Sequence, residues 1–124
     1  MKVLVVVDMQ NDFIDGSLGT AEAKAAVPAV MEKIRSFDGR IIATRDTHGA
    51  DYLDTAEGKH LPVVHCVKGT EGWKIRNEID SLLDEKGAVR IDKPTFGSTE
   101  LGEYVKKLDE EETLEEITLI GVCT

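Results

Sequence analysis

The run from Lys2 to Asp8 constrains this sequence most, because five consecutive apolar residues end there at a carboxylate. Four of the five are valine, and β-branched side chains favour an extended strand. Since the apolar residues do not alternate with polar ones, the strand is expected to be covered on both faces, as in a parallel α/β sheet. Ligands bind at the carboxyl ends of such strands, so Asp8 is a candidate functional acid. The alternative is that Asp8 only caps the following loop or helix.

Composition limits the classes of protein that this chain can represent. Its 124 residues with 41% hydrophobic content fit a single domain over residues 1–124 with a packed core. The net charge of −9 argues against binding to nucleic acid or to an anionic membrane surface. We expect neither a signal peptide nor a membrane span. The cysteines, Cys66 and Cys123, form no CxxC motif and are expected to be reduced thiols of a cytoplasmic protein.

Helical and strand patterns alternate along the rest of the chain, which predicts βαβ units with right-handed crossovers. An α/β fold with a doubly wound parallel sheet follows from this order. The first helix is predicted over 21–37, or from just before Pro28, because proline is unfavourable inside a helix. The other elements are strands at 40–45, 88–92 and 116–121, and helices at 72–86 and 99–108, the last capped by Ser98. The acidic run 109–112 is interpreted as a solvated turn or helix end.

Strand ends present Asp8, Lys93 and the segment 121–124, and in a doubly wound sheet such ends converge on one crevice. A carboxylate beside a lysine is a candidate general base whose charge the cation stabilises. A nearby cysteine would complete a hydrolytic trio. The alternative interpretation of Asp8 and Lys93 is a simple salt bridge.

All the histidines of the chain lie in the irregular stretch 47–72, which also holds several acids. Asp46 and His48 are two residues apart at a strand end, so both can reach one metal ion, with Glu57 and His65 downstream. Nitrogen and oxygen ligands suit zinc, iron or manganese. The alternative is a polar loop with incidental histidines, and His60 is the least convincing candidate.

Five separated motifs occur in an order that resembles the isochorismatase-like cysteine hydrolases, and the resemblance covers the whole chain. Within that family, the Asp-x-His and His-Cys-Val-x-Gly-Thr patterns are most similar to those of nicotinamidases. The motifs are Val-Asp-Met-Gln-Asn-Asp-Phe at 7–13, Thr-Arg-Asp-Thr-His at 44–48, His-Cys-Val-Lys-Gly-Thr-Glu-Gly at 65–72, Asp-Lys-Pro-Thr-Phe at 92–96 and Gly-Val-Cys-Thr at 121–124.

The resemblance implies a role for each matched residue. Catalytic roles fall on the acid and the lysine of an Asp-Lys-Cys triad, which are Asp8 and Lys93 here. Metal ligation would fall on Asp46, His48 and His65, with Glu57, or Asp54 in its place, as the remaining ligand. The metal is expected to be zinc, with iron or manganese as alternatives. Substrate-binding roles fall on Phe13, which would pack on the substrate ring, and on Val122 and Cys123, at a position where the family has a cis peptide near the oxyanion site.

The implied activity is hydrolysis of a small amide such as nicotinamide to nicotinate and ammonia, through a thioester and with the metal positioning the ring nitrogen. The family's nucleophilic cysteine comes three residues after the position of Cys123, so it is expected beyond Thr124. The last strands and helices of the three-layer α/β/α, Rossmann-like fold are likewise expected to be missing. We therefore expect a truncated, inactive fragment of an enzyme that forms a homo-oligomer. The alternatives are an isochorismatase or N-carbamoyl amidase of the same family, or a non-catalytic metal-binding or interaction protein.

Overall fold

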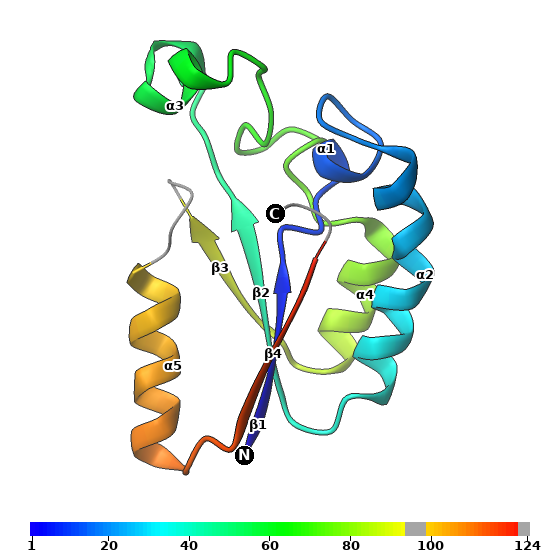
Figure 1. Cartoon of the computed structure of the whole chain (residues 1–124), viewed down its shortest axis with the longest axis vertical. Coiled ribbons are helices and arrows are strands. Elements are labelled where there is room, and N and C mark those ends of the chain that lie inside the picture. Colours follow the sequence, from blue (N-terminus) through cyan, green and yellow to red (C-terminus); the bar gives the residue numbers. More distant parts are fainter. Residues whose placement is uncertain (94–98, 122–124) are drawn as a thin grey trace.

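The computed structural model describes residues 1–93 and 99–121, which form a parallel four-stranded sheet between helices (Figure 1). The strands are β1 (Lys2–Val7), β2 (Arg40–Asp46), β3 (Val89–Lys93) and β4 (Glu116–Gly121), in the order β3-β2-β1-β4. This confirms the predicted parallel α/β sheet. Strands β2 and β3 lie on one side of β1, and β4 lies on the other side. The carboxyl end of β1 is therefore at the topological switch point, where such sheets bind ligands.

Helices cover both faces of the sheet, which gives the predicted three layers. Figure 1 shows α2 (Ala21–Ser36) and α4 (Asn77–Glu85) on one face and α5 (Thr99–Glu111) on the other. Because side chains alternate along β1, Leu4 and Val6 pack with the core residues of α2 and α4, whereas Val3 and Val5 pack toward α5. The unbroken apolar run of β1 is therefore explained by a core on each side.

Helix α2 runs through Pro28, so the predicted alternative start just before that proline is wrong. The helix begins where the Thr20 hydroxyl accepts a hydrogen bond from the backbone N–H of Ala23, at 3.0 Å. The buried positions Ala23, Val27, Val30 and Ile34 recur at helical spacing, and this apolar stripe outweighs the hydrogen bond that Pro28 cannot donate. No helix in residues 1–93 or 99–121 has the length and apolarity to cross a membrane.

Helix α4 begins five residues later than the predicted start at Gly72. The backbone of residues 72–76 instead pairs with the segment that follows β1. The Gly72 carbonyl accepts a hydrogen bond from the Asp12 N–H, and the Lys74 carbonyl accepts one from the Asn11 N–H. The other helix ends lie close to their predictions. Helix α5 reaches Glu111 and so includes most of the acidic run, while the predicted cap Ser98 lies outside the described residues. Three short helices complete the fold: α1 (Asn11–Ile14), the 3₁₀ helix η1 (Tyr52–Asp54) and α3 (Ala56–His60), the last two within the stretch predicted as irregular.

The two faces of the sheet differ in how completely they are buried. Ile79 of α4 is fully buried, whereas Ile117 of β4 is 46% exposed. The register pairs Ile117 with Val3 and Leu119 with Val5, so both exposed side chains lie on the α5 face of β4. The apolar contacts that stabilise this fold are therefore concentrated under α2 and α4.

Replacing isoleucine by alanine at one buried and one exposed position tests this distribution of apolar contacts. Ile79→Ala should lower the free energy of unfolding by about 2–5 kcal/mol, because it removes buried apolar atoms and leaves a cavity. Ile117→Ala is the matched control and should cost less than about 1 kcal/mol. Urea denaturation followed by circular dichroism measures both, and equal losses would contradict the assigned core.

Candidate functional site

The carboxyl end of β1 carries an acid in an unusual backbone conformation. Asp8 has a φ of 50°, in the left-handed region that non-glycine residues seldom adopt. Its N–H donates to the carbonyl and the hydroxyl oxygen of Thr44, both at 3.2 Å, which holds the conformation in place. Strained residues of this kind cluster at functional sites, where the surrounding structure enforces them.

Asp8 and Lys93 form a buried ion pair, as the sequence predicts. Lys93 Nζ lies 2.8 Å from Asp8 Oδ2, and the Thr44 hydroxyl donates to the other carboxylate oxygen at 2.7 Å. The two residues are only 5% and 7% exposed. The side chain of Asp8 is thus fixed at both oxygens, an arrangement that suits a positioned acid–base group and also the salt bridge considered as the alternative.

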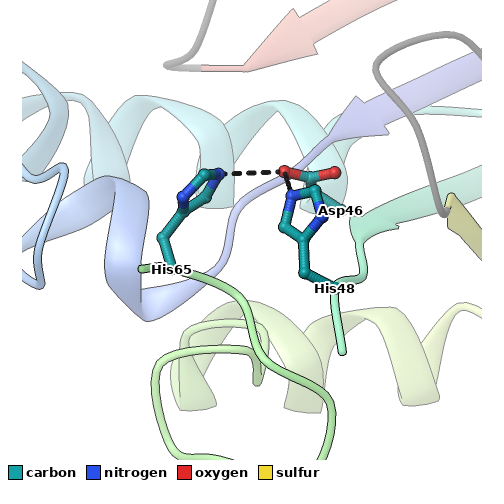
Figure 2. A group of neighbouring side chains, drawn as sticks. All are labelled: Asp46, His48 and His65. Atoms are coloured by element: carbon teal, nitrogen blue, oxygen red, sulfur yellow. Dashed lines mark hydrogen bonds and ion pairs between the residues drawn. The ribbon is translucent and has the colours of Figure 1, made fainter. Parts of the chain in front are cut away.

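Three predicted metal ligands come together beside this pair. Figure 2 shows the Asp46 carboxylate between the His48 and His65 rings, and Asp46 Oδ2 lies 3.0 Å from His48 Nε2 and 3.4 Å from His65 Nε2. The candidate ligand atoms all lie within 4.8 Å of one another, and all three residues are buried. Within the described part of the chain, the buried Asp46 Oδ1 has no hydrogen-bond partner. An orphaned carboxylate oxygen beside two imidazoles fits a divalent cation such as Zn²⁺.

The histidine orientations leave their metal-binding nitrogens directed inward. The Val63 carbonyl lies 2.7 Å from His65 Nδ1, so this nitrogen donates and Nε2 faces Asp46. Burial raises the pKa of Asp46, but hydrogen bonds from His65 and His48 and the charge of His48 outweigh it, so the net pKa is lowered. Burial alone would lower the pKa of His65, yet the Asp46 carboxylate and the Val63 carbonyl raise it overall. The site is therefore arranged to hold positive charge next to Asp46.

The remaining predicted ligand positions lie further out. Glu57 on α3 has Oε2 3.8 Å from His48 Nε2 and its side chain is 38% exposed, so it borders the three-residue group without joining it. Asp54, the alternative, is exposed on η1. His60 is also exposed, in agreement with its low ranking among the histidines.

Both constellations open onto one cavity of about 380 Å³. Asp8 and Lys93 line it together with Asp46, His65 and the ring of Phe13, whose centroid lies 5.5 Å from that of His65. The volume is in the range of small-molecule sites, and an apolar wall with a few polar groups is their usual lining. The predicted substrate residues Val122 and Cys123, with the expected cis peptide between them, lie outside the described residues.

Sequence reasoning missed a buried amide that holds the metal-ligand segment. Gln10 is fully buried, and its side chain accepts from the Asp46 N–H and donates to the Asp46 carbonyl, both at 2.8 Å. It also donates to the Trp73 carbonyl at 2.7 Å. Strand β1 ends at Val7 and so provides no backbone partner for Asp46. The Gln10 amide supplies the two hydrogen bonds that a continuing strand would have made with the Asp46 backbone. Its place two residues after Asp8, within the motif at 7–13, is the sequence signal that could have pointed to it.

Replacement of this amide tests its contribution. Gln10→Met keeps the length of the side chain but leaves the buried N–H and carbonyl of Asp46 without partners, so it should lower the free energy of unfolding by at least about 2 kcal/mol. The adjacent buried Met9→Leu, which conserves apolar volume, should cost less than about 1.5 kcal/mol. Equal losses in chemical denaturation would show that the amide is dispensable.

Comparison with known proteins agrees with this geometry. The chain is 26% identical to the nicotinamidase of Saccharomyces cerevisiae, in an alignment that covers 99% of this chain and 76% of that enzyme. The structure of the yeast nicotinamidase superposes with a TM-score of 0.78. The pyrazinamidase of Pyrococcus horikoshii in complex with zinc is 29% identical, with a TM-score of 0.71 over 99% of this chain and 71% of that one.

A third relative has a different named activity. The structure of N-carbamoylsarcosine amidase from Thermoplasma acidophilum is also 29% identical, with a TM-score of 0.70 over 97% of this chain and 66% of that one. The isochorismatase domain family as a whole matches residues 2–124. With a match that spans nearly every residue and a fold shared with these structures, the chain belongs to the isochorismatase family.

Proposed function

We propose that the chain carries the acid, the lysine and the metal site of an amidohydrolase that acts on nicotinamide or a closely similar aromatic carboxamide. The observation that supports this most is the single cavity lined both by the Asp8–Lys93 pair and by Asp46 and His65 of the candidate metal site. The nicotinamidase and zinc-bound pyrazinamidase relatives favour the same activity.

The metal would be held by Asp46, His48 and His65, with Glu57 as a further ligand after a small movement of α3. Zinc fits the two imidazoles and the carboxylate, and iron and manganese are the alternatives. When bound, the ion supplies a Lewis-acidic anchor for the ring nitrogen of the substrate. Phe13 lies against His65 and provides an apolar surface on which an aromatic ring can pack.

The proposed reaction begins when Asp8 accepts the proton of a cysteine thiol, while Lys93 stabilises the charges that develop. The thiolate attacks the amide carbonyl, and backbone N–H groups near Cys123 would bind the oxyanion. Protonated Asp8 gives its proton to the amide nitrogen, so the C–N bond breaks, ammonia leaves and a thioester remains. Water, with Asp8 as the base, then hydrolyses the thioester to the carboxylic acid and restores the thiol. We propose, from the resemblance, that this thiol belongs to a position after Thr124; Cys66 is fully buried and is not our candidate. We therefore expect a polypeptide of residues 1–124 to release no ammonia from nicotinamide.

The similarity to N-carbamoylsarcosine amidase favours a second candidate, an N-carbamoyl amidase that uses the same acid and lysine. Such an enzyme would need no metal for recognition, since its substrate has no ring nitrogen. Metal binding and the choice of ligand therefore separate the two candidates.

Zinc binding tests the proposed ligand set. Isothermal titration should show one Zn²⁺ per chain, and His48→Ala should weaken binding by at least about 100-fold, because loss of even an outer-shell partner costs 10–100-fold. His60→Ala is the matched control and should change the affinity by less than about twofold, since His60 is exposed and outside the group. Similar losses in the two variants would contradict the site.

A second measurement tests the substrate class. The zinc-loaded chain should bind nicotinamide at least about tenfold more tightly than benzamide, which has the same shape but no ring nitrogen to contact the metal. Removal of zinc with a chelator should abolish this difference. Binding observed by NMR that is equal for the two amides, or tighter for an N-carbamoyl amino acid, would favour the second candidate.

A further inference from the structure

Tyr52 is a buried residue that contacts the metal site without being one of its ligands. Its side chain is 1% exposed and lines the cavity. The ring centroid lies 4.5 Å from that of His48 and 5.0 Å from that of His65, at interplanar angles of 58° and 76°. One aromatic ring therefore packs against both candidate histidine ligands, which come from different segments of the chain.

The same residue is bonded to α3, which follows it in the sequence and lies beyond the carboxyl ends of the strands (Figure 1). The Tyr52 hydroxyl donates to the carbonyl of Leu61, the residue that ends α3, at 2.8 Å. Burial, and after it the carboxylates of Glu57 and Asp46, raise the pKa of this hydroxyl, so it stays protonated and able to donate.

The backbone of Tyr52 holds the other end of α3. Its carbonyl accepts hydrogen bonds from the N–H and the hydroxyl of Thr55, the residue that caps α3. Gly58 packs so closely that a Cβ there would lie 2.0 Å from the Tyr52 carbonyl oxygen. Tyr52 is thus attached to both ends of a helix that also contributes Ala56, Glu57 and His60 to the cavity wall.

We propose that Tyr52 is a positioning residue that couples the metal site to the cavity wall, so that a divalent cation held by His48 and His65 orders α3 and Leu61. This inference rests on the proposed metal site. Fixing the two imidazole rings restricts the Tyr52 ring, which packs against both, and the hydroxyl passes that restriction to the Leu61 carbonyl. The part of the cavity wall formed by α3 and Leu61 is then fully assembled only when the metal is bound.

Hydrogen exchange of the 124-residue chain, followed by NMR with and without Zn²⁺, tests the coupling. The reporters are the Lys59 and Leu61 amides, which donate to the Thr55 and Glu57 carbonyls within α3. In the unsubstituted chain Zn²⁺ should slow their exchange about tenfold or more. In Tyr52→Phe, which removes only the hydroxyl, the slowing should fall below about threefold, with Zn²⁺ affinity changed by less than about threefold.

Two further variants separate Tyr52 from other routes. Tyr104→Phe is the matched control, since Tyr104 lies on α5 and packs against the core cluster that contains Val3 and Val5, and it should keep the full slowing. Glu57→Gln, at the proposed further metal ligand on α3, tests the direct route from the metal to that helix. Loss of the slowing in Glu57→Gln but not in Tyr52→Phe would overturn the inference and assign the coupling to Glu57.

The remaining outcomes are equally decisive. Zn²⁺ binding that leaves the Lys59 and Leu61 amides of the unsubstituted chain unchanged would overturn the role of Tyr52 and leave the proposed metal site intact. Absence of Zn²⁺ binding in every variant would overturn the metal site itself, and the coupling with it.

Discussion

The parallel pairing of β1 with β2 and of β2 with β3 is the constraint on which the candidate site depends. The register pairs Val7 with Thr44 and Asp46 with Lys93, so the carboxyl ends of β1, β2 and β3 meet at one edge of the sheet. Residues far apart in the sequence thereby reach one cavity. A slip of one residue in either pairing would turn the functional side chains to the opposite face.

Burial of charge at this edge requires that nearly every polar atom has a partner, because an unpaired buried charge costs several kcal/mol. Lys93 and Thr44 satisfy the two oxygens of Asp8, and Gln10 satisfies the backbone of Asp46. The exception among the described residues at this site is Asp46 Oδ1. An unsatisfied oxygen in an otherwise saturated network is where a cation would complete the structure.

The segment between β2 and α4 carries both candidate metal-ligand histidines and part of the cavity wall. Its ends are fixed by β2 and by a short bridge between His48 and Val67, while η1 and α3 extend over the cavity. The candidate metal-ligand histidines are near its fixed ends, and α3, which lines the cavity, is in its middle. Tyr52 contacts both histidine rings and the Leu61 carbonyl, so the two parts of the segment are joined.

Local sequence patterns by themselves determined the strands, the main helices of the two helical layers and the candidate residues Asp8, Asp46 and His48. These features depend on the spacing of nearby residues, which the sequence displays directly. Only the tertiary structure decided the start of α4, the continuation of α2 through Pro28, the distance of Glu57 from the candidate metal ligands, and the contacts of Gln10 and Tyr52. Each of these rests on contacts between residues distant in the chain or on the burial of a particular face. Hydrogen bonds such as that from Gln10 to Trp73 form only after the chain has folded, so no local pattern encodes them.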